Sequence, residues 1–326
     1  MDDAHKETDK ILADMEKQLR KEYKQATEEM EKKLNKYLQA YKRKDDAKRN
    51  QMKSGEISQD EYRKWRFGQL AVGKRWRDMR DALAQDMANT NILARSIADG
   101  YMPEVYAVNH NFATYQIESG ASIDTSYTLY DAQSVERLVR ENPNILPKPG
   151  KSTEKLIKSG DLQKWDKNVI QSTMIQGILQ GESIPNLSKR MARNLGEKDY
   201  KNMVRHARTM TTATQNAGRV DGFKRAQDMG IDVKQTWVAT LDGRTRHEHR
   251  VLDGQTRDVG EYFEVEDYKI RYPGDPEADY AMIMNCRCTL IGQIKGFERD
   301  TTAYRHDPDF GDMTYEEWKD AKAKSE

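Results

Sequence analysis

The sequence contains little cysteine and little proline, and it has no long apolar run. Two cysteines and eight prolines occur among 326 residues, and the cysteines, Cys286 and Cys288, are separated by one residue. Such a pair excludes a disulfide framework and suits a reducing compartment. No apolar run approaches the roughly 20 residues that span a bilayer, and the first ten residues are too charged for a signal peptide. We therefore expect no membrane association, and synthesis and assembly in a cytoplasm.

The sequence also lacks an excess of charge of one sign. Its 55 Lys and Arg residues nearly balance 54 Asp and Glu residues, for a net charge of +1. No global field would draw the chain onto DNA or an anionic membrane, so any nucleic-acid contact has to be local. Hydrophobic residues reach only 36% and the mean hydropathy is −0.99, which is polar for a globular protein. These values predict elongated helices with much exposed surface.

The N-terminal region is predicted to be helical. Residues 6–48 contain neither glycine nor proline, and good helix formers dominate. Their apolar residues recur with an eleven-residue period, which predicts a straight or slightly right-handed seam that needs a partner helix. A turn at residues 53–58 and a Ser58–Glu61 capping box then predict a helical hairpin. An oligomeric coiled coil is the alternative.

Residues 59–98 continue the helical pattern, with Gly68 and Gly73 as weak points. Within this range, residues 64–67 (KWRF) and 74–77 (KRWR) interleave basic and aromatic side chains. The pattern is typical of proteins that bind single-stranded nucleic acid. The alternative is an amphipathic helix whose Lys and Arg stems cover apolar surface.

A loop-like stretch at residues 142–150, with three prolines and a glycine, marks a predicted boundary. Helices are predicted after it at residues 164–179 and 199–229, and Gly230 ends the second one. The second helix has an apolar stripe at helical spacing, formed by Met203, Ala207, Met210, Ala213, Ala217, Val220 and Phe223. Its opposite side has a polar stripe, formed by Arg208, Thr212, Asn216 and Arg219. That stripe either recognises a partner or the stretch around Trp237, or it is a solvated face.

The stretch from Trp237 to Leu290 holds most of the unusual chemistry. Strands are predicted at residues 233–239, 268–272, 281–284 and 289–294. A turn at residues 242–243 and a short helix at 244–252 place Arg246 and His249 on one helix face. Asp242 stands four positions before Arg246, which favours an ion pair that joins strand and helix. We expect a small α+β unit.

His249, Cys286 and Cys288 are candidate zinc ligands, because imidazole and thiolate groups bind Zn²⁺. His247 or Asp253 is the candidate fourth ligand. The alternative is that the cysteines pack as small buried hydrophobes and that His249 forms hydrogen bonds within the fold. The sequence has no GxSxG, phosphate-binding glycine loop or HExxH pattern. We therefore predict no catalytic residue and no cofactor besides this candidate zinc.

An ordered series of residues in this stretch resembles the C-terminal signature of the phage Mu protein F-like family, the minor head or head morphogenesis proteins of tailed bacteriophages. The series is Trp237, Asp242, Arg244-Thr245-Arg246, His249, Leu252-Asp253-Gly254, Phe263, Pro273-Gly274 and Asn285-Cys286-Arg287-Cys288. The preceding residues 207–216 resemble the lead-in helix of the family. Residues before about 150 match only in general character.

The resemblance implies a non-enzymatic minor head protein. Its expected partners are the portal protein and the major capsid or scaffolding protein, its expected location is the virion, and contact with packaged DNA or its ejection is a further expectation. The residues expected to form the structural family motif are Trp237, Asp242, Arg244, Arg246, His249, Asp253, Gly254, Asn285, Cys286 and Cys288.

The expected fold class is α+β, predominantly α, in three parts. Residues 1–150 form an elongated helical arm with a loop-rich end. Residues 151–298 form a MuF-like domain with helices at 164–230 and an α+β unit at 231–295. Residues 299–326 form an appendage, in which a Thr314–Glu317 capping box predicts a last, peripheral helix.

Two other functions stay open. His249 and the Cys286/Cys288 pair could serve a metal-dependent hydrolase or a toxin-like enzyme, because MuF-type domains also occur joined to enzymatic domains. The short stretch after Ile294 argues against a further domain of that kind. A DNA-binding protein of the genome end would use residues 64–77, and its affinity would fall steeply with salt.

Overall fold

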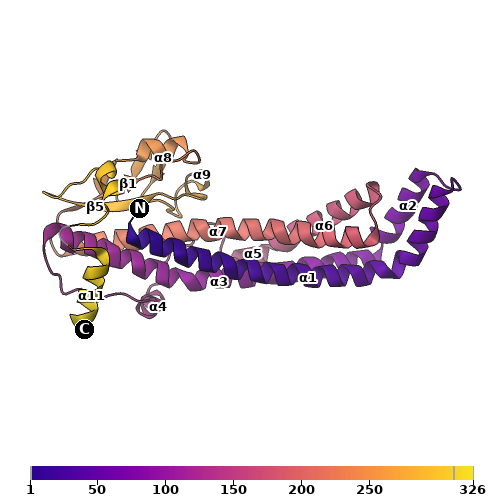
Figure 1. The fold of residues 1–326 in the computed structure, drawn as a ribbon, viewed down its shortest axis with the longest axis horizontal. Helices are drawn as coiled ribbons and strands as arrows, with labels where there is room; N and C mark the ends of the chain where they lie inside the picture. The colour runs from indigo at the N-terminus through magenta and orange to yellow at the C-terminus, as the bar shows by residue number, and fades with distance from the viewer. Residues whose placement is uncertain (1, 311–312, 326) are drawn as a thin grey trace. The chain divides into compact units, whose positions relative to one another are not determined.

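The computed structural model describes residues 2–310 and 313–325, and Figure 1 shows its elements in chain order. The described residues form eleven helices: α1 (Asp3–Lys53), α2 (Gln59–Leu70), α3 (Lys74–Ala121), α4 (Ala132–Glu141), α5 (Thr153–Ser159), α6 (Asp161–Leu179), α7 (Ile184–Asp228), α8 (His247–Leu252), α9 (Tyr280–Ile283), α10 (Thr301–His306) and α11 (Tyr315–Ser325). Five short strands lie between α7 and α10: β1 (Val233–Val238), β2 (Thr256–Asp258), β3 (Phe263–Val265), β4 (Tyr268–Ile270) and β5 (Thr289–Ile294). The predicted α+β, predominantly α class is confirmed. Among the described helices, none is long and apolar enough to cross a membrane.

The described chain forms two compact units, each assembled from separated segments. The sheet unit takes the described residues of Met1–Glu16, Ala98–Lys151 and Arg205–Glu326, and the helical unit takes Lys17–Ile97 and Ser152–Val204. Helices α1, α3 and α7 each contribute to both units. The predicted three-part division near residues 150 and 298 follows the order of the sequence and stays a prediction.

In the helical unit, the apolar seam of α1 is buried as its period predicts. Its buried residues in this unit are Leu19, Tyr23, Met30, Leu34, Tyr37 and Leu38. Ser58 and Glu61 form the predicted capping box at the start of α2. The Tyr62 hydroxyl donates to Asp45 of α1 (2.9 Å), and Arg66 pairs with the same carboxylate (2.9 Å). The predicted helical hairpin is therefore confirmed.

Helix α3 is longer than the sequence pattern predicts, and α7 runs without a break from Ile184 through the helix predicted at residues 199–229. Helix α3 continues past Ala98 and through Pro103 to Ala121, and its residues 105–118 are all buried. Burial of this kind stabilises a helix more than local propensity does. Within the sheet unit the two helices approach closely at Gly218, where a Cβ atom would lie 2.7 Å from the Tyr106 carbonyl oxygen. Only glycine permits this approach.

The sheet unit contains a three-stranded antiparallel sheet of order β2-β1-β5 and a separate β3-β4 hairpin. Strands β1 and β5 pair from Val233 opposite Ile294 to Val238 opposite Thr289. Three of the four predicted strands are present, but the strand predicted at residues 281–284 is wrong. Residues 281–283 belong to α9 instead, and Met284 is its C-cap residue, because the Asp279 carboxylate accepts a hydrogen bond from the Ala281 N–H (2.7 Å) and caps a helix there.

The C-terminal helix begins at the predicted capping box, since Thr314 and Glu317 exchange hydrogen bonds. The expectation that this helix is peripheral is wrong. Tyr315 and Trp318 are buried in the sheet unit, and the Trp318 indole donates to Glu118 of α3 (2.8 Å). Residues 311, 312 and 326 of the predicted appendage lie outside the described residues.

Candidate functional site

Helix α7 presents its predicted polar stripe to the backbone that leads into β5. The Thr212 hydroxyl donates to the Cys286 carbonyl (2.6 Å), and the Asn216 amide donates to the Cys288 carbonyl (3.2 Å). The Asn216 side-chain oxygen in turn accepts from the Leu290 N–H (3.0 Å). Three of the four stripe residues, Thr212, Asn216 and Arg219, therefore contact the Trp237 stretch, whereas Arg208 is half-exposed and pairs with Glu16 of α1.

Arg219 continues the stripe as a buried charge. Its guanidinium donates to the Leu290 carbonyl (2.9 Å), to Asn109 (3.0 Å) and to the Asp2 carboxylate (2.8 Å). Burial alone would raise the pKa of Asp2, but the charge of Arg219 and the hydrogen bond from Tyr304 hold that pKa below its ordinary value. The two charges of this pair are at most 1% exposed, so each depends on the other for compensation.

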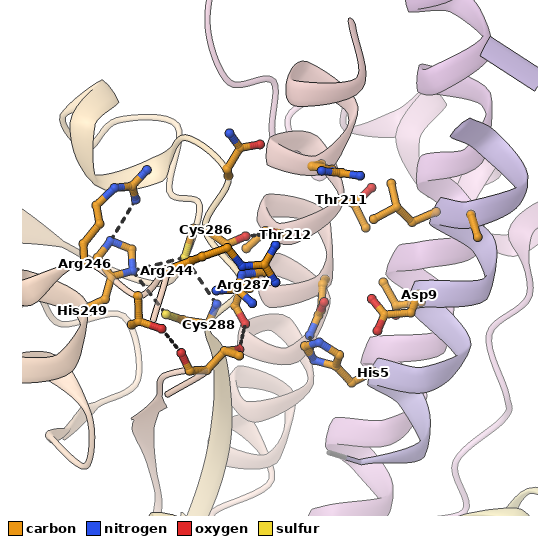
Figure 2. A pocket seen from close by; sticks show the side chains of 18 of the residues that line it. His5, Asp9, Thr211, Thr212, Arg244, Arg246, His249, Cys286, Arg287 and Cys288 are labelled. Carbon is orange, nitrogen blue, oxygen red and sulfur yellow. Dashed lines mark hydrogen bonds between the residues drawn. The ribbon is translucent and has the colours of Figure 1, made fainter. Parts of the chain in front are cut away.

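The three candidate zinc ligands lie together beside these hydrogen bonds (Figure 2). His249 Nδ1 lies 3.2 Å from Cys288 Sγ and 3.5 Å from Cys286 Sγ. The ligand atoms of the three residues all lie within 4.8 Å of one another, and the three side chains are buried. Alternate residues of an extended segment point to the same side, so the single-residue spacing of the cysteines brings both sulfurs to one imidazole.

The two thiols differ in acidity. Burial would raise the pKa of the Cys286 thiol, but hydrogen bonds from Cys288 and the charges of Arg246 and Arg287 outweigh burial and lower this pKa below its ordinary value. The hydrogen bond to Cys286, together with burial, raises the pKa of the Cys288 thiol well above its ordinary value.

Arg287 lies between the two cysteines in the sequence and forms an ion pair with Asp242. Its two terminal nitrogens lie 2.7 and 2.8 Å from the two Asp242 oxygens. This bidentate contact holds the pKa of Asp242 well below its usual range. The predicted Asp242–Arg246 ion pair is wrong, because Arg287 occupies the carboxylate. Arg246 instead donates to the Met284 carbonyl and places Nη1 3.4 Å from Nε2 of His249.

The residues predicted as a fourth zinc ligand lie elsewhere. His247 is exposed, and its Nε2 lies 3.9 Å from a carboxylate oxygen of Glu266. Asp253 accepts a hydrogen bond from the Ala239 N–H (2.8 Å) and pairs with Arg305 (2.5 Å). Within the described chain, the ligand group thus consists of one imidazole and two thiols.

A cavity of about 660 Å³ borders this group. Figure 2 shows its wall, with His5 and Asp9 on α1, Thr211 and Thr212 on α7, and the imidazole and thiols opposite them. Arg208 and Glu16 also line the cavity and form an ion pair with each other at 2.7 Å. The wall is polar and carries both signs of charge, so it suits water and small polar groups.

Trp237 packs beneath the ligand group. Its ring is fully buried and lies edge-on to the His249 ring, with centroids 5.8 Å apart, and edge-on to Phe263, with centroids 5.4 Å apart. The Gly254 N–H donates to the Trp237 carbonyl (2.9 Å) from a backbone with φ +80°, a conformation that favours glycine. Trp237 thus packs against the imidazole, and Gly254 holds the backbone of Trp237.

The remaining motif residues, Asn285 and Arg244, flank the ligand group differently. Asn285 has φ +50° directly before Cys286, and its backbone N–H donates to Thr209 of α7 (3.2 Å). Arg244 has an 80% exposed side chain, 3.5 Å from Asp242. Asn285 therefore positions the extended segment, whereas Arg244 is available at the surface.

Sequence reasoning missed several residues that hold the site from a distance. Asp2 and Tyr304 surround Arg219, and Arg305 neutralises Asp253. Gln215 donates to Thr289 of β5 (3.1 Å). The helical spacing of polar residues on α7 could have indicated Gln215, but the other contacts have no local signal in the sequence.

The basic and aromatic segment at residues 64–77 is partly buried in the helical unit, whereas its Phe67 side chain is 41% exposed. Arg66 is fully buried against Asp45, and Trp76 is 1% exposed with its indole donating to Gln171 (2.6 Å). Bases cannot stack on buried rings. This packing favours the interpretation as an amphipathic helix.

Comparison with known proteins identifies the region that contains this site. Residues 168–291 match the family model described as Phage Mu protein F like protein. That range contains most of α6, all of α7 and the three candidate ligands. No solved structure gives a significant match to the chain.

Curated relatives match different shares of their own lengths. Minor head protein GP7 of Bacillus phage SPP1 is 26% identical over 294 residues, which cover 88% of this chain and 85% of that protein. NAD(+)–arginine ADP-ribosyltransferase EFV of Enterococcus faecalis is 30% identical over 211 residues, and an uncharacterized protein of Haemophilus influenzae is 29% identical over 212 residues. The chain spans 40% of the length of each of these two relatives. Residues 168–291 are therefore a phage Mu protein F-like region, and this match together with the minor head protein match supports a role in phage head morphogenesis.

Proposed function

We propose that this chain is a minor head protein that associates with the portal protein and with the major capsid or scaffolding protein of a tailed bacteriophage, without catalysis. The observation that carries the proposal is the similarity to minor head protein GP7 over 88% of this chain and 85% of that protein. A match of this extent includes both compact units rather than the family motif alone. The virion is then the final location, and the host cytoplasm is the place of assembly.

The contacts of the family motif support a structural role for it. Arg287 engages the Asp242 carboxylate on both oxygens, and Arg305 engages Asp253. Thr212 and Asn216 hold the backbone on either side of Arg287. Polar groups that are paired in this way fix a rigid surface, which suits docking to a partner.

The similarity to an ADP-ribosyltransferase defines the enzymatic rival. That match covers 40% of the enzyme, and the activity in its name belongs to that protein. Purified chain incubated with NAD⁺ and an arginine-containing acceptor should release no nicotinamide above the rate without protein. Enzymatic release that is proportional to chain concentration would replace the non-catalytic proposal.

A co-purification experiment tests the partner assignment. The full chain is co-expressed with the portal protein, and separately with the major capsid protein, of the same phage. The lysate is treated with nuclease so that DNA cannot bridge the two. The proposal expects the chain to elute with the portal assembly in size-exclusion chromatography, and elution of the chain alone in both mixtures would contradict it.

The experiment uses the full chain because a cut near residue 150 would not yield a folded half. Such a cut would remove Asp2, the buried partner of Arg219. It would also remove Phe112 and Tyr115 of α3, which are core residues of the sheet unit. Loss of partner binding after this cut would therefore report unfolding rather than the loss of a docking arm.

A further inference from the structure

We propose that His249 Nδ1, Cys286 Sγ and Cys288 Sγ bind one zinc ion, with water in a fourth position that faces the neighbouring cavity. One imidazole and two thiolates with an exchangeable fourth ligand form a set that Zn²⁺ accepts. The proposal concerns the chain itself and holds whether or not the chain docks on a portal.

The distances between the three groups fit a tetrahedral zinc site. Zn–S bonds of about 2.3 Å and Zn–N bonds of about 2.05 Å, at the tetrahedral angle, place nitrogen and sulfur about 3.5 Å apart. The two observed Nδ1–Sγ distances are 3.2 and 3.5 Å. The ligand atoms of all three residues also lie within 4.8 Å of one another, as one common ion requires. A shared ion accounts for both Nδ1–Sγ distances.

The backbone around the cysteines is fixed before any metal arrives. Thr212 and Asn216 hold the carbonyls of Cys286 and Cys288 at 2.6 and 3.2 Å. The His249 ring is packed edge-on against the buried Trp237. Ligands that are held in place in this way lose little freedom on binding, which favours metal affinity.

The position of the Arg246 guanidinium beside His249 disfavours zinc binding. When Nδ1 binds zinc, the imidazole proton resides on Nε2 and requires an acceptor. The guanidinium of Arg246, 3.4 Å from Nε2, can only donate. Arg246 therefore has to turn away from His249 when the ion binds. Arg246→Gln would supply an amide oxygen as acceptor, and we expect this variant to bind zinc at least as tightly as the wild type.

The test uses the full chain, reduced and purified, and loaded with one equivalent of Zn²⁺ or Co²⁺. Bound zinc per chain is measured by mass spectrometry of the metal after desalting, and the sulfur-to-cobalt charge-transfer band is recorded for the cobalt form. Cys286→Ser and Cys288→Ser each remove one thiolate. His247→Ala is the matched control, because His247 is exposed and lies two positions before His249 on the same helix.

The expected result is one ion per chain in the wild type, His247→Ala and Arg246→Gln, with a charge-transfer band in the cobalt form. Each cysteine variant should lose more than about tenfold in zinc affinity, the smallest effect typical of removing even an indirect partner of a ligand. Absence of the charge-transfer band in the wild type would overturn the proposal, and that spectrum does not depend on whether any variant folds. Undiminished zinc binding by both cysteine variants would overturn it as well.

Discussion

Replacing Thr212 with valine tests whether α7 holds the segment from Cys286 to Leu290. The substitution keeps the shape of the side chain and removes the hydroxyl that donates to the Cys286 carbonyl at 2.6 Å. The neighbouring Thr211 is also buried, and its hydroxyl has no hydrogen-bond partner among the described residues. The same substitution at two adjacent sites therefore differs in one hydrogen bond.

The expected effects of the two substitutions differ in size and direction. A hydrogen bond contributes about 1 kcal/mol net, and a buried carbonyl left without a donor costs about 1–3 kcal/mol. Thr212→Val should therefore lower the free energy of unfolding by about 1.5–3 kcal/mol. Thr211→Val removes a buried hydroxyl without a partner, so it should leave the free energy of unfolding unchanged or raise it by about 1 kcal/mol.

Urea unfolding followed by circular dichroism measures both variants against the wild type. The urea midpoints of the variants are compared only if their m-values are equal. Equal m-values show that the variants expose the same surface on unfolding. Equal losses for both variants would show that the hydrogen bond to Cys286 does not hold the segment. A larger loss for Thr211→Val than for Thr212→Val would refute the reasoning outright.

Substitutions at three other buried positions also have predicted effects on stability. Arg219→Met leaves Asp2 buried without its cation, so the free energy of unfolding in urea should fall by about 3–5 kcal/mol. Burial, with the charge of a neighbouring carboxylate, raises the pKa of Asp166 to about 8 from an ordinary 3.8. A carboxyl group whose pKa is raised in the folded state stabilises the fold fully below its unfolded-state pKa, and this stabilisation is lost as the pH rises through its folded-state pKa. The thermal midpoint of the wild type should therefore fall as the pH rises from about 3.8 to about 8. The thermal midpoint of Asp166→Asn should change less over the same pH range. Gly218→Ala places a Cβ atom 2.7 Å from the Tyr106 carbonyl oxygen, so the thermal midpoint should drop by several degrees.

Each of these outcomes has a control. Adding Asp2→Asn to Arg219→Met should recover part of the lost stability, and no recovery would mean that the two charges do not compensate each other. A pH slope in Asp166→Asn equal to that of the wild type would assign the slope to other groups. Gly68→Ala is the control for Gly218, because a Cβ atom at Gly68 meets nothing within 4 Å.

Local signals in the sequence predicted the ends of many elements. The Ser58–Glu61 and Thr314–Glu317 capping boxes are present, and Gly230 follows α7 with φ +86°. Strand β5 has its predicted bounds, Thr289–Ile294. These features depend on neighbours within a few residues, which is why a pattern along the chain can indicate them.

Features that depend on tertiary contacts were not predictable in the same way. The buried part of α3 beyond Ala98 has no strong helical period, and burial against α7 stabilises it instead. Residues 281–284 look like a strand because they are apolar, but the cap from Asp279 starts a helix that includes residues 281–283. Short apolar runs do not distinguish a strand from a buried helical turn.

The candidate site was partly predictable from residue chemistry. The types and spacing of His249, Cys286 and Cys288 indicated a common site, and the structure brings the three together. The partner of Asp242 was not predictable, because Arg287 lies 45 positions away and Arg246 is a plausible local alternative. Contacts of that range follow from the pairing of β1 with β5, which no short pattern specifies.

Quantitative peptide mass spectrometry on purified, DNA-filled particles tests most directly whether this chain is a minor head component. The particles come from an induced host culture, and peptides of this chain are counted against those of the portal and major capsid proteins. The account predicts a few copies of the chain in each particle, well below the number of major capsid subunits. Absence of the chain from mature heads would contradict it.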